Sequence, residues 1–128
     1  MRFYLDSSVI IEVVLNPKKI FSSEVNGSQR YFTSRLSQVE VLRTITKLNP
    51  DLLSRAAQVI SRIQFIEFSP RIIDSASTYP QEITLKSSDA IHMATAEEIL
   101  DVDDLLITYD KQMVSSAKKL GINVATSF

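Results

Sequence analysis

The stretch SSDAIHMATA at residues 87–96 combines strong helix formers with an acidic residue in what would be the first turn of a helix. Serine is a favoured N-cap because its hydroxyl accepts a hydrogen bond from an unpaired backbone N–H, and an aspartate in the first turn complements the positive end of the helix dipole. We therefore predict a helix from Ser87 to about Leu100 that carries Asp89 at its start. Three other acids lie at comparable junctions along the chain: Asp6, Glu40 and Asp110.

On both sides of this helix, short β-branched and aromatic runs alternate with longer amphipathic ones. Strands are expected at residues 2–5, 31–34, 65–68, 105–108 and 122–125. Helices are expected at residues 9–15, 37–48, 51–63, 87–100 and 113–120, with another starting at Pro70 and a short helix and turn over 18–29. The alternation predicts an α/β fold in three layers (α/β/α), with a central parallel sheet of about five strands.

Length and composition predict one globular domain over residues 1–128, because 128 residues with 45% hydrophobic content suffice for one core. No apolar run is long enough to span a bilayer, and an acid at position 6 interrupts the N-terminal segment too early for a signal peptide. The absence of cysteine fits a cytoplasmic protein. A formal net charge of −1 gives no overall attraction for nucleic acid, so RNA binding would need a local basic patch.

The four acids are expected at one edge of the sheet, since ligands of open parallel sheets bind beyond the carboxyl ends of the strands. Asp6 follows the first strand and Asp110 the fourth, while Glu40 lies one turn into the helix after the second strand and Asp89 begins a helix that returns across the sheet. Carboxylates that lie close together repel one another unless a cation lies between them, and hard oxygen ligands suit Mg²⁺ or Mn²⁺. The pattern predicts a metal site for phosphodiester hydrolysis.

Each acid also has a purely structural interpretation. Asp6 and Asp110 are good N-caps for the helices that follow them, and Glu40 would complete a capping box with Ser37. Capping is the more common explanation for any one of these residues. Their conjunction is what favours a functional site.

Three further residues lie close to these acids in the sequence. Ser8 and Thr108 carry hydroxyls that either orient the carboxylates of Asp6 and Asp110 or serve as caps and strand residues, and both interpretations remain open. His92 is one turn after Asp89, and we expect it to have a packing or hydrogen-bonding role.

Four segments resemble, in order and spacing, the acidic motifs of PIN-domain ribonucleases, above all the small VapC toxins of prokaryotic toxin–antitoxin pairs: LDSSVI (5–10), SQVEV (37–41), SDAIHMATA (88–96) and TYD (108–110). The resemblance implies a three-layer α/β/α fold and an endoribonuclease dependent on Mg²⁺ or Mn²⁺, with Asp6, Glu40, Asp89 and Asp110 as its metal-binding and catalytic acids. It also implies an RNA substrate, a homodimer and a cognate antitoxin whose C-terminal segment lies over the active site. Many relatives have another acid shortly after the fourth, where this chain has Lys111–Met113, so this corner of the site is weaker or depends on Asp110 alone.

Two other enzyme or signalling folds with acidic pockets fit the sequence poorly. A receiver-like domain would need paired acids after the first strand, an acceptor aspartate after the third and a lysine after the fifth, and a haloacid-dehalogenase-like phosphatase would need an aspartate where Ser8 stands. The remaining alternative is a PIN-fold module that binds RNA or a protein without cutting. The lack of a further acid after Asp110 keeps this alternative open.

Overall fold

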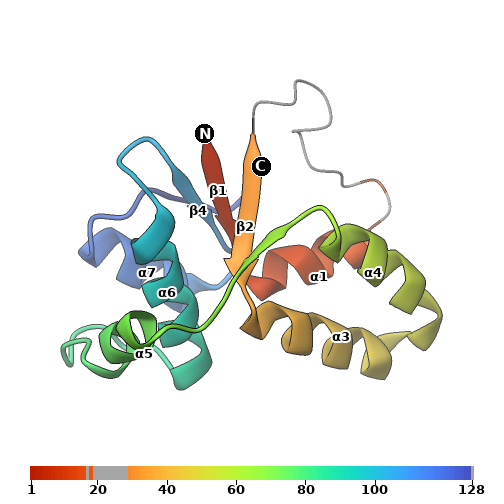
Figure 1. Cartoon of the computed structure of the whole chain (residues 1–128), viewed down its shortest axis with the longest axis horizontal. Coiled ribbons are helices and arrows are strands. Elements are labelled where there is room, and N and C mark those ends of the chain that lie inside the picture. Colours follow the sequence, from red (N-terminus) through yellow and green to blue (C-terminus); the bar gives the residue numbers. More distant parts are fainter. Residues whose placement is uncertain (17, 19–28, 128) are drawn as a thin grey trace.

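A parallel sheet lies at the centre of the molecule (Figure 1), for which the computed structural model describes residues 1–16, 18 and 29–127. The strand order is β3-β2-β1-β4-β5, and every neighbouring pair is parallel. The strands are β1 (Arg2–Leu5), β2 (Arg30–Ser34), β3 (Gln64–Ile66), β4 (Leu105–Ile107) and β5 (Val124–Ala125). The α/β class and the five expected strands are confirmed.

Helices cover both faces of the sheet, with α1, α3 and α4 on one side and α5, α6 and α7 on the other (Figure 1). Their bounds are α1 (Ser7–Leu15), α3 (Leu36–Leu48), α4 (Leu53–Ile60), α5 (Pro70–Ser77), α6 (Ser87–Ile99) and α7 (Lys111–Lys119). The three expected layers are thus present. The short helix and turn expected over residues 18–29 lie almost entirely outside the described residues.

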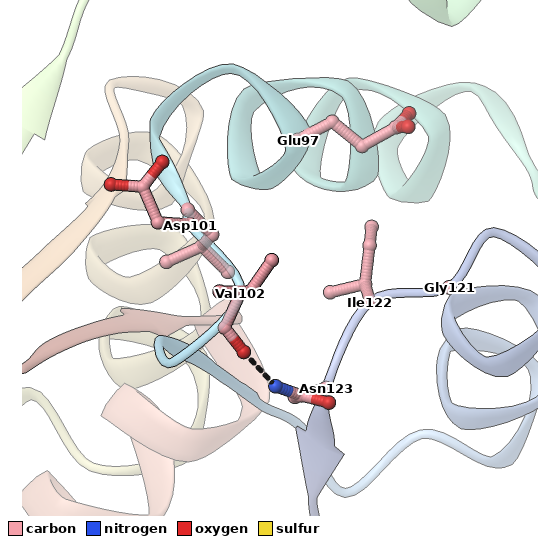
Figure 2. Close-up of a pocket in the computed structure, with 7 residues that line it drawn as sticks. Glu97, Asp101, Val102, Gly121, Ile122 and Asn123 are labelled. Atoms are coloured by element: carbon pink, nitrogen blue, oxygen red, sulfur yellow. Dashed lines mark hydrogen bonds between the residues drawn. The ribbon is translucent and has the colours of Figure 1, made fainter.

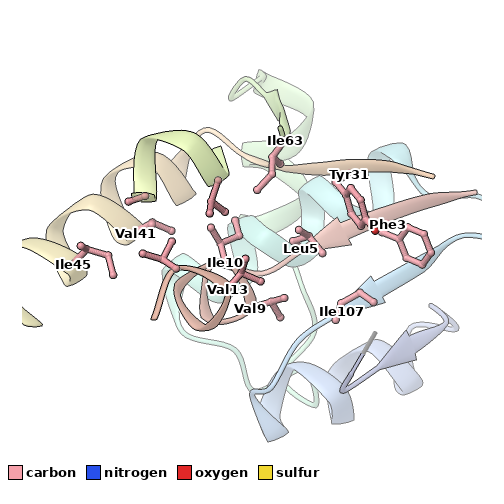
Figure 3. Packing of buried hydrophobic residues seen from close by; sticks show 13 residues of the cluster. Phe3, Leu5, Val9, Ile10, Val13, Tyr31, Val41, Ile45, Ile63 and Ile107 are labelled. Carbon is pink, nitrogen blue, oxygen red and sulfur yellow. The ribbon is translucent and has the colours of Figure 1, made fainter. Parts of the chain in front are cut away.

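Two apolar clusters join the helices to the sheet, because successive side chains of a strand point to opposite faces. Leu5 of β1 packs in the first cluster with Ile10 of α1 and Val41 of α3 (Figure 3). Tyr4, the preceding residue, packs in the second cluster with Met93 of α6 and Met113 of α7. The clusters fix the directions in which both helix layers approach the carboxyl edge of the sheet.

Several predicted elements have different bounds in the structure, among them β5, which covers Val124–Ala125 rather than 122–125. The expected helix over 51–63 is a 3₁₀ turn, η1 (Pro50–Leu52), followed by α4. The Asn49 side chain caps this turn by accepting a hydrogen bond from the Asp51 N–H, and Pro50 takes its first position, where no N–H is needed. β3 ends at Ile66 instead of Phe68 because its partner β2 ends at Ser34, opposite Ile66.

Of the predictions for the helix ends, one for α7 is confirmed and one for α6 is wrong. Gly121 follows α7 with φ of +75°, and the Ile122 N–H donates to the Ala117 carbonyl, as in a Schellman motif, so the expected role of this glycine is confirmed. The expected serine N-cap of α6 is wrong: the cap is Lys86, without a side-chain hydrogen bond. The helix begins directly at Ser87, which leaves Asp89 in the first turn as expected.

Within the described ranges, no helix is long and apolar enough to cross a membrane.

Candidate active site

Asp6 and Asp110 lie at the carboxyl ends of the neighbouring strands β1 and β4. Asp6 follows β1 directly, is only 4% exposed, and caps α1 by accepting a hydrogen bond from the Ser8 N–H at 3.0 Å. Asp110 caps α7 by accepting from the Met113 N–H at 3.0 Å. Both residues thus have the capping role that the sequence indicates. Capping uses only one oxygen of each carboxylate.

Thr108 connects these two acids. Its hydroxyl donates to Asp6 Oδ2 at 2.5 Å and accepts from the Asp110 N–H at 3.1 Å. Thr108 is fully buried, so its hydroxyl orientation is determined by these two partners. A charge-assisted bond of this length holds the Asp6 carboxylate in one rotamer.

Ser8 contributes its backbone rather than its hydroxyl to the Asp6 carboxylate. Its backbone N–H donates to Asp6, while its Oγ accepts from the Tyr109 N–H at 3.5 Å. The hydroxyl beside Asp6 is that of Ser7, which donates to Oδ1 at 3.4 Å. The helical turn that begins at Ser7 sends the Ser8 side chain toward β4 instead.

Glu40 comes from α3 and makes a contact that the sequence pattern does not indicate. Its Oε1 lies 2.6 Å from Nε2 of His92, a buried residue of α6. The expected capping box with Ser37 is wrong, because α3 begins at Leu36, one residue before it. The Leu36 N–H donates to the Ser34 hydroxyl, and the Ser37 hydroxyl points inward, 2.6 Å from the Thr33 hydroxyl. The hydrogen-bonding role expected for His92 is confirmed.

Tyr4 is the residue of this region that sequence reasoning missed. Its hydroxyl lies 2.8 Å from His92 Nδ1 and accepts from the Ser34 N–H at 3.0 Å. Tyr4 is completely buried in β1 between two apolar residues, Phe3 and Leu5. A tyrosine inside a short buried strand needs a hydrogen-bond partner, and this requirement was the available signal.

Asp89 is the acid most affected by its surroundings. Burial raises the pKa of its carboxyl above the ordinary value, and the negative charges of Asp6, Asp110 and Glu40 raise it further, while a positive charge on His92 would lower it. Asp6, Glu40 and Asp110 therefore all lie close enough to Asp89 for their charges to act on its carboxyl. We call this group, Asp6, Glu40, Asp89 and Asp110, the acidic rim.

The chemistry of the acidic rim suits a small divalent cation. Its donors are all carboxylate oxygens, and a cation would offset the repulsion that raises the Asp89 pKa. Among the described residues, no three acidic or histidine side chains are gathered into a ready-made ion cage. Mg²⁺ does not require one, because it retains several waters and commonly binds through one or two carboxylates.

Two other hollows contain none of these acids. A cavity of about 360 Å³ lies at the opposite edge of the sheet (Figure 2), where its lining includes Glu97, Asp101 and Asn123. A second, apolar cavity of about 420 Å³ lies between α3 and the segment after β3, beside Val39 and Phe68. Neither brings carboxylates together as the acidic rim does.

Asp89→Asn is expected to stabilise the metal-free protein at pH 7 by up to about 1 kcal/mol, because it removes a partly exposed charge that its neighbours repel. A carboxyl whose pKa is raised by folding destabilises the fold fully above the folded pKa and not at all below the unfolded pKa, about 3.9. The gain should therefore decline as the pH falls from the raised pKa toward about 3.9. Urea unfolding at several pH values measures it, with Asp74→Asn on α5 as an exposed control. An equal gain at every pH would contradict the electrostatic cause.

Comparison with known proteins gives consistent results for sequence and structure. The family model of the PIN domain matches residues 3–126. The chain is 36% identical over 97 residues to ribonuclease VapC35 of Mycobacterium tuberculosis, which covers 74% of this chain and 71% of that protein. It is 31% identical over 130 residues to ribonuclease VapC46 of the same organism, which covers 94% of each chain.

Solved structures with the same fold span nearly the whole chain. A DNA-bound VapBC structure from Salmonella typhimurium superposes with a TM-score of 0.73 at 16% identity and covers 98% of this chain and 97% of that one. A toxin–antitoxin complex from Klebsiella pneumoniae superposes with a TM-score of 0.67 at 20% identity, with coverage of 98% and 97%. At these identities the superpositions establish the fold.

Proposed function

We propose, since this chain belongs to the PIN-domain family and to its VapC-type ribonucleases, that the acidic rim is the active site of a metal-dependent endoribonuclease. The observation that carries the assignment is the convergence of the acids: the Thr108 hydroxyl joins Asp6 to Asp110, His92 of α6 contacts Glu40, and Asp89 lies within reach of the charges of all three. The four acids come from separate segments, and the charges of three of them act on the fourth at the sheet edge where α/β proteins bind ligands. Capping accounts for Asp6 and Asp110 at neighbouring strand ends, but not for Glu40 and Asp89, since neither is the N-cap of its helix.

Asp6, Glu40, Asp89 and Asp110 are the residues that would hold Mg²⁺ or Mn²⁺. The bound ion would polarise a phosphoryl oxygen of RNA and lower the pKa of a water molecule for attack on the phosphodiester. The chain itself orients the Asp6 carboxylate: the Thr108 hydroxyl donates to Oδ2 and the Ser8 N–H donates to Oδ1. The Asp89 carboxylate remains available to a metal ion, since no described group donates a hydrogen bond to it.

A PIN module that binds RNA or protein without cutting is the second candidate. The specific observation in its favour is the segment after Asp110, where Lys111 and Gln112 are exposed and no further acid follows. One carboxylate oxygen of Asp110 also accepts a hydrogen bond from the Met113 N–H. The part of the acidic rim that follows β4 therefore has a single carboxylate, that of Asp110, and one of its oxygens caps α7.

We further propose that the chain is the toxin of a toxin–antitoxin pair, acts in the cytoplasm as a homodimer, and binds a cognate antitoxin over the acidic rim. Support comes from relatives named ribonuclease VapC and from superposition on structures of VapBC complexes. A short neighbouring reading frame that encodes a small DNA-binding protein would support this assignment. Its absence would count against the pairing without affecting the nuclease proposal.

The nuclease proposal is tested by incubating the purified protein, freed of any antitoxin, with structured RNA and Mg²⁺ or Mn²⁺. Cleavage should occur, stop on addition of EDTA, and resume when an excess of the metal is restored, because the rim carboxylates need the cation to act together. Gel analysis of end-labelled RNA measures all three steps. Cleavage that persists in EDTA would overturn the metal site, whereas metal binding without cleavage of any cellular RNA would favour the binding module.

A further inference from the structure

One buried imidazole joins a rim acid to the centre of the sheet. His92 is fully buried on α6, with Nε2 2.6 Å from Glu40 Oε1 and Nδ1 2.8 Å from the Tyr4 hydroxyl. The Tyr4 oxygen in turn accepts from the Ser34 N–H at 3.0 Å. Backbone, phenol, imidazole and carboxylate thus form one continuous series of hydrogen bonds.

The positions of the hydrogens follow from what each group can donate. Burial raises the pKa of the Tyr4 phenol well above its usual range, so it keeps its proton. Its oxygen already accepts from Ser34, and His92 Nδ1 at 2.8 Å is an acceptor for its O–H, beside the more distant hydroxyls of Thr33 and Thr95. A neutral imidazole that accepts at Nδ1 carries its hydrogen on Nε2, which faces Glu40.

We propose that His92 is a positioning residue: Tyr4 fixes its tautomer, and its Nε2–H holds Glu40 in the orientation that the acidic rim requires. The inference rests on the proposed function only in assigning Glu40 to the metal site. Glu40 is a long side chain on α3 with 28% of its surface exposed, and an unrestrained glutamate would sample several rotamers. Only one oxygen, Oε1, contacts His92, so Oε2 is available to bind a metal ion.

The location of His92 explains how two helix layers cooperate. α3 and α6 cover opposite faces of the sheet, and His92 of α6 contacts an acid of α3. His92 also lies three residues after Asp89, so α6 supplies one rim acid directly and orients another. A carboxylate oriented by such a bond typically binds metal 10 to 100 times more tightly than without it, by order of magnitude.

Nuclear magnetic resonance tests the tautomer directly, because the chain contains a single histidine and its ring signals need no assignment. Long-range ¹H–¹⁵N spectra of the metal-free protein should show hydrogen on Nε2 and none on Nδ1. Tyr4→Phe should convert this to a mixture of both tautomers. Hydrogen on Nδ1 in the wild type would overturn the proposal.

Mn²⁺ affinity, measured by electron paramagnetic resonance, tests the effect on Glu40. His92→Leu should weaken binding about 10-fold or more, and His92→Gln, whose amide can still donate to Glu40, should recover most of the affinity. Met93→Ala is the matched control, because Met93 is equally buried on α6 but packs in the apolar cluster. It should lower thermal stability and leave Mn²⁺ affinity unchanged. Wild-type affinity in His92→Leu would overturn the positioning role.

The two proposals fail in different ways. A wild-type protein with the expected tautomer that neither binds Mn²⁺ nor cuts RNA would refute the nuclease while the orientation of Glu40 by His92 stands. Cleavage and Mn²⁺ binding that are both insensitive to His92→Leu would refute the positioning role while the nuclease stands.

Discussion

Asp6→Asn is expected to lower the rate of RNA cleavage by at least about 100-fold and to destabilise the protein by about 1–3 kcal/mol, because the amide nitrogen that replaces Oδ2 cannot accept from the buried Thr108 hydroxyl. A metal ion contributes several kcal/mol of charge stabilisation in the transition state, and each 1.4 kcal/mol is about tenfold in rate. Asparagine removes the charge that would bind the ion. It keeps an oxygen that can accept from the Ser8 N–H, and asparagine is as good an N-cap as aspartate, so α1 should begin normally.

Asp104→Asn provides the matched control for this variant. Asp104 is also a buried aspartate, 8% exposed, but lies at the opposite edge of the sheet, where it accepts from the N–H groups of Arg2 and Asp101. Its replacement should lower stability, since backbone hydrogen bonds hold the pKa of its carboxyl below the ordinary value despite burial, and should leave cleavage unchanged. Equal loss of cleavage in both variants would indicate that Asp6 acts through stability alone.

Local patterns were sufficient for the elements that bring the acids to the sheet edge. β1 and the residues after it were predictable because a short apolar strand followed by Asp6 and two serines carries both the strand and the cap in consecutive residues. The end of α7 was predictable for the same reason, since Gly121 supplies the left-handed conformation that the turn needs. In each case the determinants lie within a few positions of one another.

The connections between elements were not predictable in this way. Glu40 and His92 are 52 residues apart, and Tyr4 and His92 are 88 residues apart, so no local period indicates either contact. The Ser-x-x-Glu pattern at residues 37–40 even favoured a different partner for Glu40. Tertiary packing prevailed because α3 begins at Leu36, whose N–H donates to the Ser34 hydroxyl, and Ser37 is buried beside Thr33.

Thr108→Val should reduce cleavage about 10- to 100-fold and destabilise the protein by about 1–3 kcal/mol. Valine matches threonine in shape but leaves Asp6 Oδ2, in a nearly buried carboxylate, without its 2.5 Å donor. The Asp110 N–H loses its acceptor at the same time. Both acids would then lack the group that orients them. Removing such a partner of a metal ligand typically lowers metal affinity or activity by about 10- to 100-fold.

Thr108→Ser and Thr33→Val separate orientation from stability. Serine keeps the hydroxyl, so Thr108→Ser should retain most of the activity. Thr33 is another fully buried threonine at a strand end, but its hydroxyl donates to the Leu5 carbonyl at 2.7 Å rather than to an acid, so Thr33→Val should lower stability and leave cleavage intact. Urea unfolding and initial cleavage rates of the three variants measure both effects. If Thr33→Val lost as much activity as Thr108→Val at equal destabilisation, the hydroxyl between Asp6 and Asp110 would have only a structural role.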